Sequence, residues 1–261
     1  MPCLMEENLH RPLSEILPII QDGIMKKSSY FGVKTLKNPA DAWVYQEILF
    51  ETQPDVIVEI GTNCGGSTLM LAHLCDLIGK GRVIGLDLSH ATVPERVKTH
   101  PRITLIEGDA CGKVGEIAAL IAENERIMVI EDSSHTYGNT LNVLRTYAHF
   151  VTPGCYFIVE DSVCHHGLPE GPSPGPYEAI ETFVGELSGF IIDREREHLV
   201  VTWNPKGFLK RLEGKYEASG RPLFPSAEGH GGMVKLLKLL LPPIITMAFS
   251  RLLRRSGRNQ G

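Results

Sequence analysis

The chain has 261 residues, of which 43% are hydrophobic and 22% charged, as expected for a globular protein with one substantial core. This composition excludes a disordered chain, and the net charge of −5 gives no reason to expect nucleic acid as a partner. Six scattered cysteines without a CxxC pair favour free thiols in a reducing compartment. The N-terminus lacks a basic and then apolar secretory pattern, so a cytoplasmic location is expected.

Residues 1–50 are predicted to form a mostly helical segment, whose last helix Asp41 would cap. Five apolar runs then alternate with helix-like stretches, so we expect strands at 56–60, 83–88, 103–107, 127–132 and 155–161. This alternation predicts an α/β fold with a Rossmann-like, doubly wound and mostly parallel sheet. We expect the core to occupy residues 51–215, followed by a basic and apolar extension at 216–261.

The segment after the fifth strand has a different pattern. Residues 167–177 are rich in proline and glycine and must form a loop. A helix is expected next, and FIIDRE, LVVTW and GFLKRL are short strand candidates. No internal repeat is visible along the chain.

Four of the predicted strands finish on carboxylates, which lie at Glu59, Asp87, Asp132 and the Glu160-Asp161 pair. In a parallel sheet, ligands bind in the crevice at the carboxyl ends of the strands. Acids at these positions are costly to bury unless they bind a cation or several hydrogen-bond donors. The sequence therefore predicts a ribose-bearing cofactor and a hard metal ion at one edge of the sheet.

The cofactor crevice is expected around the glycine-rich turn that follows the first strand. The turn would let the backbone approach a ligand closely, and Asp87 would accept hydrogen bonds from ribose hydroxyls. Asp109 would lie beside an adenine ring. The glycine spacing is not GxGxxG, which disfavours an NAD enzyme, and a purely structural turn remains an alternative. The expected cofactor-binding residues are Glu59, Gly61, Thr62, Ser67, Asp87 and Asp109.

The metal site is expected where Asp132 meets Glu160 and Asp161. Three carboxylates favour an oxygen-seeking divalent ion, with Mg²⁺ the first choice and Mn²⁺ or Ca²⁺ as substitutes. His135 would then act as general base toward a metal-bound hydroxyl. Taken singly, these residues could instead cap a loop or begin a helix, and His165 and His166 compete with His135. A non-haem iron triad is disfavoured, because no HxD or HxE occurs in the chain.

The motifs resemble those of the cephalosporin hydroxylase-like group, which includes rhamnosyl and macrolide-sugar O-methyltransferases. The landmarks run from Tyr30 to Leu212 and comprise YFG with Lys37, DAWVYQEIL, VEIGTNCGGS, EDSSH, FVTPGCYFIVEDS, PGPYEAIE, DRERE and PKGFL. The order E-I-G, L-D and G-D-A is also similar to that of class I S-adenosylmethionine-dependent methyltransferases.

This resemblance implies an enzyme that uses S-adenosylmethionine and Mg²⁺ to methylate a sugar hydroxyl of a rhamnosyl-type glycoside, glycolipid or secondary metabolite. It implies that Asp132, Glu160 and Asp161 hold the metal, that His135 is the base, and that residues 168–177 border the acceptor pocket. Two alternatives stay open at this point. One is a hydroxylase component of the cephalosporin hydroxylase type, and the other is a cofactor-binding protein without catalytic activity.

The last part of the chain has a different composition from the rest. Residues 206–261 contain 11 basic and 3 acidic residues, against 15 basic and 28 acidic in residues 1–205. Residues 233–255 mix an apolar run, broken by Pro242-Pro243 and too short to span a bilayer, with basic flanks. This extension would either lie on an anionic membrane surface or pack on its own domain or on a second subunit of a homo-oligomer.

Overall fold

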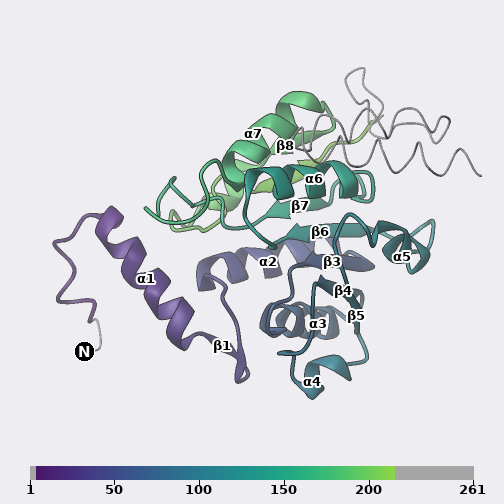
Figure 1. Cartoon of the computed structure of the whole chain (residues 1–261), viewed down its shortest axis with the longest axis horizontal. Helices are drawn as coiled ribbons and strands as arrows, with labels where there is room; N and C mark the ends of the chain where they lie inside the picture. Colours follow the sequence, from purple (N-terminus) through teal and green to yellow (C-terminus); the bar gives the residue numbers. More distant parts are fainter. Residues whose placement is uncertain (1–3, 215–261) are drawn as a thin grey trace, which may run out of the picture. The chain divides into compact units, whose positions relative to one another are not determined.

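The computed structural model describes residues 4–214, and a seven-stranded sheet forms their centre (Figure 1). The strand order is β5-β4-β3-β6-β7-β9-β8, in which the first five are parallel and β9 is antiparallel to both of its neighbours. The predicted α/β fold with a doubly wound, mostly parallel sheet is therefore confirmed. The strands are β3 (Val56–Ile60), β4 (Arg82–Asp87), β5 (Ile103–Glu107), β6 (Ile127–Glu131), β7 (Tyr156–Val159), β8 (Phe190–Ile192) and β9 (Phe208–Arg211).

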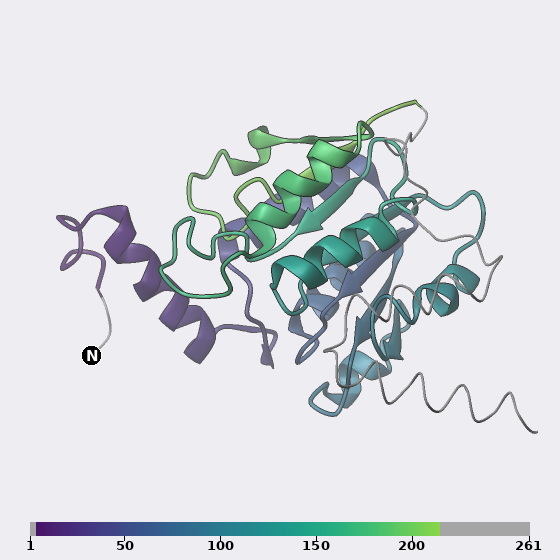
Figure 2. The same cartoon turned by 45° about the horizontal axis from the view of Figure 1, so that its top comes forward.

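The central strands are buried on both faces, which explains why they read as continuous apolar runs. In β3, Val56 and Val58 belong to one apolar cluster, and Ile57 between them belongs to the other. The first cluster includes residues of α6 (Tyr137–Tyr147) and α7 (Pro176–Glu186), which lie side by side on one face (Figure 2). The second includes residues of α2 (Pro39–Thr52) and α3 (Gly66–Ile78).

The N-terminal part consists of α1 (Leu13–Lys27), a hairpin of β1 (Ser29–Tyr30) and β2 (Val33–Lys34), and then α2. A third, smaller apolar cluster attaches α1 to the rest of the described chain. In this cluster Leu17 and Ile24 of α1 pack with residues of two later loops, Val163, Leu168 and Trp203. The remaining short elements are α4 (Glu95–Lys98), α5 (Val114–Ala119) and the 3₁₀ helix η1 (Arg194–Glu197).

Two local predictions were wrong, and Asp41 is involved in both. Asp41 does not cap α2, because Asn38 does so and accepts a hydrogen bond from the Ala40 amide at 3.1 Å. Instead the buried Asp41 carboxylate accepts from the Thr202 hydroxyl at 2.5 Å and from the Trp203 amide at 2.7 Å. LVVTW (199–203) therefore forms no strand, since its Trp203 amide bonds to a side chain rather than to a sheet neighbour.

The strand order reverses between β3 and β6, and in open α/β sheets ligands bind beside such a reversal. Among residues 4–214, no helix is both long enough and apolar enough to cross a membrane. The extension predicted at 216–261, with its basic and apolar stretch at 233–255, lies outside the described residues.

Candidate active site

A cavity of about 960 Å³ opens at the carboxyl ends of the parallel strands. One part of its wall comes from the loops that follow the strands, and includes Gly61, Asp87, Asp109, Asp132 and Asp161. The other part comes from α1 and the proline-rich loop, and includes Pro18, Gln21, Met25, Leu168 and Pro172. The crevice predicted from the strand ends is therefore present, and α1 adds a wall that the sequence did not indicate.

Gly61 brings the predicted cofactor turn against the predicted metal loop. Its φ is +96°, and a Cβ atom built on it would lie 2.0 Å from the Asp132 carbonyl oxygen. Backbone hydrogen bonds hold the turn on both sides, from the Gly61 amide to the Leu86 carbonyl (2.7 Å) and from the Asp132 amide to the Ile60 carbonyl (2.8 Å). Only glycine combines this conformation with this contact.

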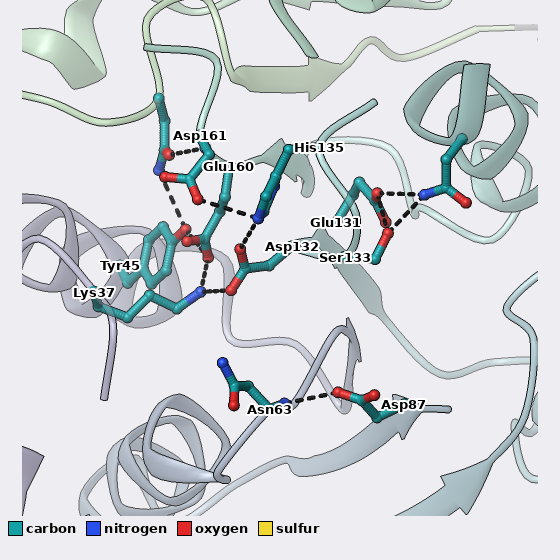
Figure 3. Close-up of polar contacts among 12 residues, drawn as sticks. Lys37, Tyr45, Asn63, Asp87, Glu131, Asp132, Ser133, His135, Glu160 and Asp161 are labelled. Carbon is teal, nitrogen blue, oxygen red and sulfur yellow. Dashed lines mark hydrogen bonds and ion pairs between the residues drawn. The ribbon is translucent and has the colours of Figure 1, made fainter. Parts of the chain in front are cut away.

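Three of the six predicted cofactor residues line the cavity, namely Gly61, Asp87 and Asp109. One oxygen of Asp87 accepts a hydrogen bond from the Asn63 amide at 2.7 Å, which fixes the carboxylate at the cavity wall (Figure 3). The other three, Glu59, Thr62 and Ser67, are buried residues that do not line it. Glu59 accepts from the Thr68 hydroxyl at 2.5 Å, so it supports the start of α3 from below the turn.

Three side chains of the predicted metal and base set meet at the cavity (Figure 3). Asp132, His135 and Asp161 each offer one ligand atom, and these atoms lie within 4.8 Å of one another. The His135 Nε2 atom is 3.3 Å from Asp161 Oδ2 and 4.0 Å from Asp132 Oδ1. The loops after β6 and β7 thus bring together residues that are 29 positions apart in the sequence, since β6 and β7 are neighbours in the sheet.

Glu160 lies beside this group but faces a buried lysine. The Lys37 Nζ atom contacts Asp132 Oδ2 at 2.5 Å and also Glu160 Oε1, and only 6% of the Lys37 side chain is exposed. The Tyr45 hydroxyl donates to the same Glu160 oxygen at 2.6 Å. Asn204 extends the network, because it donates to the Tyr45 hydroxyl and accepts from the Asp161 amide, each at 3.3 Å.

The charge in this cluster is incompletely balanced. Burial raises the pKa values of Asp132, Glu160 and Asp161 above those of ordinary carboxyl groups, and the mutual repulsion of the three carboxylates raises them further. The positive charge of Lys37 acts in the opposite direction. Burial lowers the pKa of Lys37, but its acidic neighbours outweigh burial and raise it above the usual range. A set of desolvated carboxylate oxygens with one ammonium among them fits an additional divalent cation.

The backbone around the crevice is strained at three residues other than glycine. Asn63, His135 and Asp161 have φ values of 47°, 55° and 54°, in the left-handed region that most side chains avoid. Such conformations cluster at functional sites, where the surrounding structure maintains them. Each of the three residues lines the cavity, so the strain coincides with the site.

Glu131 supports the loop that carries Asp132 and His135, a role that the sequence motifs did not indicate. It is buried, and it accepts hydrogen bonds from Ser133 Oγ at 2.6 Å and Asn139 Nδ2 at 3.3 Å, while Asn139 also donates to Ser133 Oγ at 2.7 Å. Burial raises the pKa of Glu131 to about 8. The network connects the end of β6 to α6, and it holds the loop that carries Asp132 and His135.

The two competing histidines make other contacts. His165 Nε2 is 3.0 Å from the Gly171 carbonyl oxygen, and His166 stacks on Tyr177 at 3.6 Å between ring centroids and contacts Glu178 Oε1 at 2.7 Å. These contacts organise the proline-rich loop and attach it to α7. Of the histidines considered, His135 is the one that meets Asp132 and Asp161.

Comparisons with known proteins identify the family of this chain. The family model described as Rhamnosyl O-methyltransferase/CmcI matches residues 22–212. A rhamnosyl O-methyltransferase of Mycobacterium tuberculosis is 33% identical over 195 residues, which cover 72% of this chain and 80% of that protein. The Mycobacterium leprae enzyme of the same name is 32% identical over 197 residues, which cover 73% and 83%.

A solved structure of CmcI with Mg and SAM has a TM-score of 0.57 and 25% sequence identity, and covers 71% of this chain and 76% of that one. The fold and site define a Rossmann-like methyltransferase. The chain belongs to the rhamnosyl O-methyltransferase/CmcI family, so the resemblance seen in the sequence motifs is confirmed.

Proposed function

We propose that this enzyme transfers the methyl group of S-adenosylmethionine to a hydroxyl of a sugar, with Mg²⁺ bound at Asp132, Glu160 and Asp161 and with His135 as the base. The observation that carries the proposal is that Asp132, His135 and Asp161 share one cavity with the turn at Gly61 and with Asp87. Membership of an O-methyltransferase family supports the reaction class.

The cofactor binds in the half of the cavity formed by the loops after β3, β4 and β5. Gly61 gives the ligand close access to the backbone, and Asp87 offers its second carboxylate oxygen to the ribose hydroxyls, since Asn63 occupies the first. Asp109 lies on the same wall and is assigned to the adenosine end of the cofactor. A cofactor held by these residues would lie next to the loop that carries Asp132, because Gly61 is in contact with that loop.

The chemical step needs a proton acceptor close to the acceptor hydroxyl. A bound Mg²⁺ stabilises negative charge on a hydroxyl oxygen and so eases its deprotonation. His135 takes the hydroxyl proton at Nε2, and Asp161 at 3.3 Å stabilises the imidazolium that results. The hydroxyl oxygen forms a bond to the methyl carbon while the carbon–sulfur bond of the cofactor breaks, and S-adenosylhomocysteine leaves.

The acceptor occupies the half of the cavity between α1 and the proline-rich loop. Apolar groups dominate this wall, namely Pro18, Met25, Leu36, Leu168, Pro169 and Pro172. The charged residues there are the acids Asp22 and Glu170. The lining suits a rhamnosyl-type glycoside or glycolipid whose aglycone is apolar, and it supports a role for residues 168–177 in acceptor binding.

The proposal is tested with the purified chain, S-adenosylmethionine, Mg²⁺ and a panel of rhamnosides. Mass spectrometry should show an acceptor that gains CH₂, and chelation of divalent ions should stop the reaction. Removal of a general base typically costs about 10²–10⁴-fold in rate. His135→Ala should therefore methylate the acceptor more slowly by that factor, yet still bind S-adenosylmethionine. His198→Ala is the matched control, since His198 is an exposed residue that contacts the Glu195 carbonyl and does not line the cavity. A product that gains oxygen instead would favour the hydroxylase alternative.

A further inference from the structure

Lys37 is the buried cation of the active site, although it lies in the N-terminal part of the chain, before the first strand of the large sheet. Its ammonium group touches Asp132, at the end of β6, and Glu160, at the end of β7. A buried ammonium is costly unless it is paired, and here both partners are residues assigned to the metal. Lys37 and a divalent cation would therefore draw on the same carboxylates.

The chain segment before Lys37 packs closely against the end of the cofactor turn. The Thr35 hydroxyl donates to the Val33 carbonyl at 3.0 Å and accepts from the Tyr30 amide at 3.1 Å. A Cβ atom on Gly66, the first residue of α3, would lie 1.9 Å from the Thr35 Oγ1 atom and 2.4 Å from the Lys34 carbonyl oxygen, so the two segments are in close contact. The position of the Lys37 ammonium therefore depends on the packing of the backbone before it as well as on the side-chain ion pairs.

The contacts of Lys37 leave the cavity side of the cluster open. Lys37 binds Oδ2 of Asp132, whereas the Oδ1 atom faces His135. Asp161 contributes its Oδ2 atom on the His135 side. Glu160 Oε1 is shared between Lys37 and Tyr45 on the buried side. The lysine therefore orients Asp132 and Glu160 without filling the space between Asp132, His135 and Asp161.

We propose that Lys37 is a positioning residue of the methyl-transfer site, which holds Asp132 and Glu160 in place before the divalent ion binds and weakens the binding of that ion by electrostatic repulsion. The inference rests on the proposed function, because it takes these carboxylates as the metal ligands. A built-in monovalent cation preserves the shape of the site when no metal is bound. It also keeps the divalent ion exchangeable.

The test measures Mg²⁺ binding by calorimetry and melting temperature with and without Mg²⁺, in the full chain without acceptor or S-adenosylmethionine. Lys37→Met removes the charge and keeps most of the side-chain volume. It should melt at a lower temperature than the wild type without metal, gain a larger stabilisation from Mg²⁺, and bind Mg²⁺ at least about tenfold more tightly. Damage to the fold would weaken metal binding, so tighter binding separates the two explanations.

The matched control is Lys34→Met, which changes the net charge equally at an exposed residue of β2. It should leave the Mg²⁺ affinity unchanged. Lys37→Gln, which keeps a hydrogen-bond donor for the carboxylates, covers the case in which Lys37→Met does not fold, and it should tighten Mg²⁺ binding in the same direction. Equal or weaker Mg²⁺ binding by the Lys37 variants overturns the role of Lys37. A wild-type chain that binds no Mg²⁺ refutes the proposed function itself.

Discussion

Replacement of Gly61 by alanine tests whether contact between the cofactor turn and the metal loop is needed for both ligands to bind. The new Cβ atom would lie 2.0 Å from the carbonyl oxygen of Asp132 and 3.0 Å from the Cα atom of Ser133. Both distances are below ordinary contact, so the two loops must move apart. The residue would also keep a φ of +96°, which costs a residue with a Cβ about 1–2 kcal/mol. Forced separation of packed backbone adds about 1–3 kcal/mol.

Gly79→Ala is the matched control for this substitution. Gly79 ends α3 with a φ of +78°, and a Cβ atom there would meet nothing within 4 Å. The control therefore carries the conformational cost alone. Urea denaturation should show a loss of about 2–5 kcal/mol for Gly61→Ala against about 1–2 kcal/mol for Gly79→Ala. Calorimetry should show weaker binding of both S-adenosylmethionine and Mg²⁺ in Gly61→Ala only. Equal destabilisation by the two variants, with both ligands still bound normally, would show that contact between the two loops is not needed for binding.

Burial raises the pKa of Asp41 to about 7, so its contribution to stability is fully present below about pH 4 and is lost as the pH rises through 7. Asp41→Asn should remove up to about 4 kcal/mol of the pH dependence of unfolding in urea between pH 4 and 8, and an unchanged slope would contradict this. Asp87→Ala should weaken S-adenosylmethionine binding roughly 10- to 100-fold in calorimetry while Mg²⁺ affinity stays constant, and loss of both would indicate a general collapse. Removal of residues 230–261 should reduce binding to anionic vesicles in a flotation assay, and undiminished binding would exclude a membrane role for the extension.

The strand ends could be predicted from the sequence because four of the five apolar runs stop on a carboxylate, and parallel strands share one carboxyl edge. This local signal was sufficient to predict that Asp132, Asp161 and His135 lie close together. Lys37 and Tyr45 carry no such signal. Their contacts with Glu160 span 123 and 115 positions of the sequence. These contacts form only because α2 and the segment before it pack on the sheet.

The same limit explains the error at Asp41. Its position two residues after Pro39 suits a helix cap, but its carboxylate bonds to Thr202 and Trp203 instead. These contacts span more than 160 positions, so no sequence window contains both partners. The role of α1 in the cavity wall was missed for a similar reason, because it depends on the packing of Leu17 and Ile24 against Trp203 and the loop at 163–168.

Anomalous scattering from crystals soaked in Mn²⁺ would locate the divalent ion directly. Mn²⁺ takes the same oxygen ligands as Mg²⁺ and scatters anomalously, so its place can be read without assumptions about the ligands. We expect one strong peak at the cavity, bounded by Asp132, Glu160 and Asp161 and next to His135. Mn²⁺ bound elsewhere at saturating concentration, with this position empty, would contradict it.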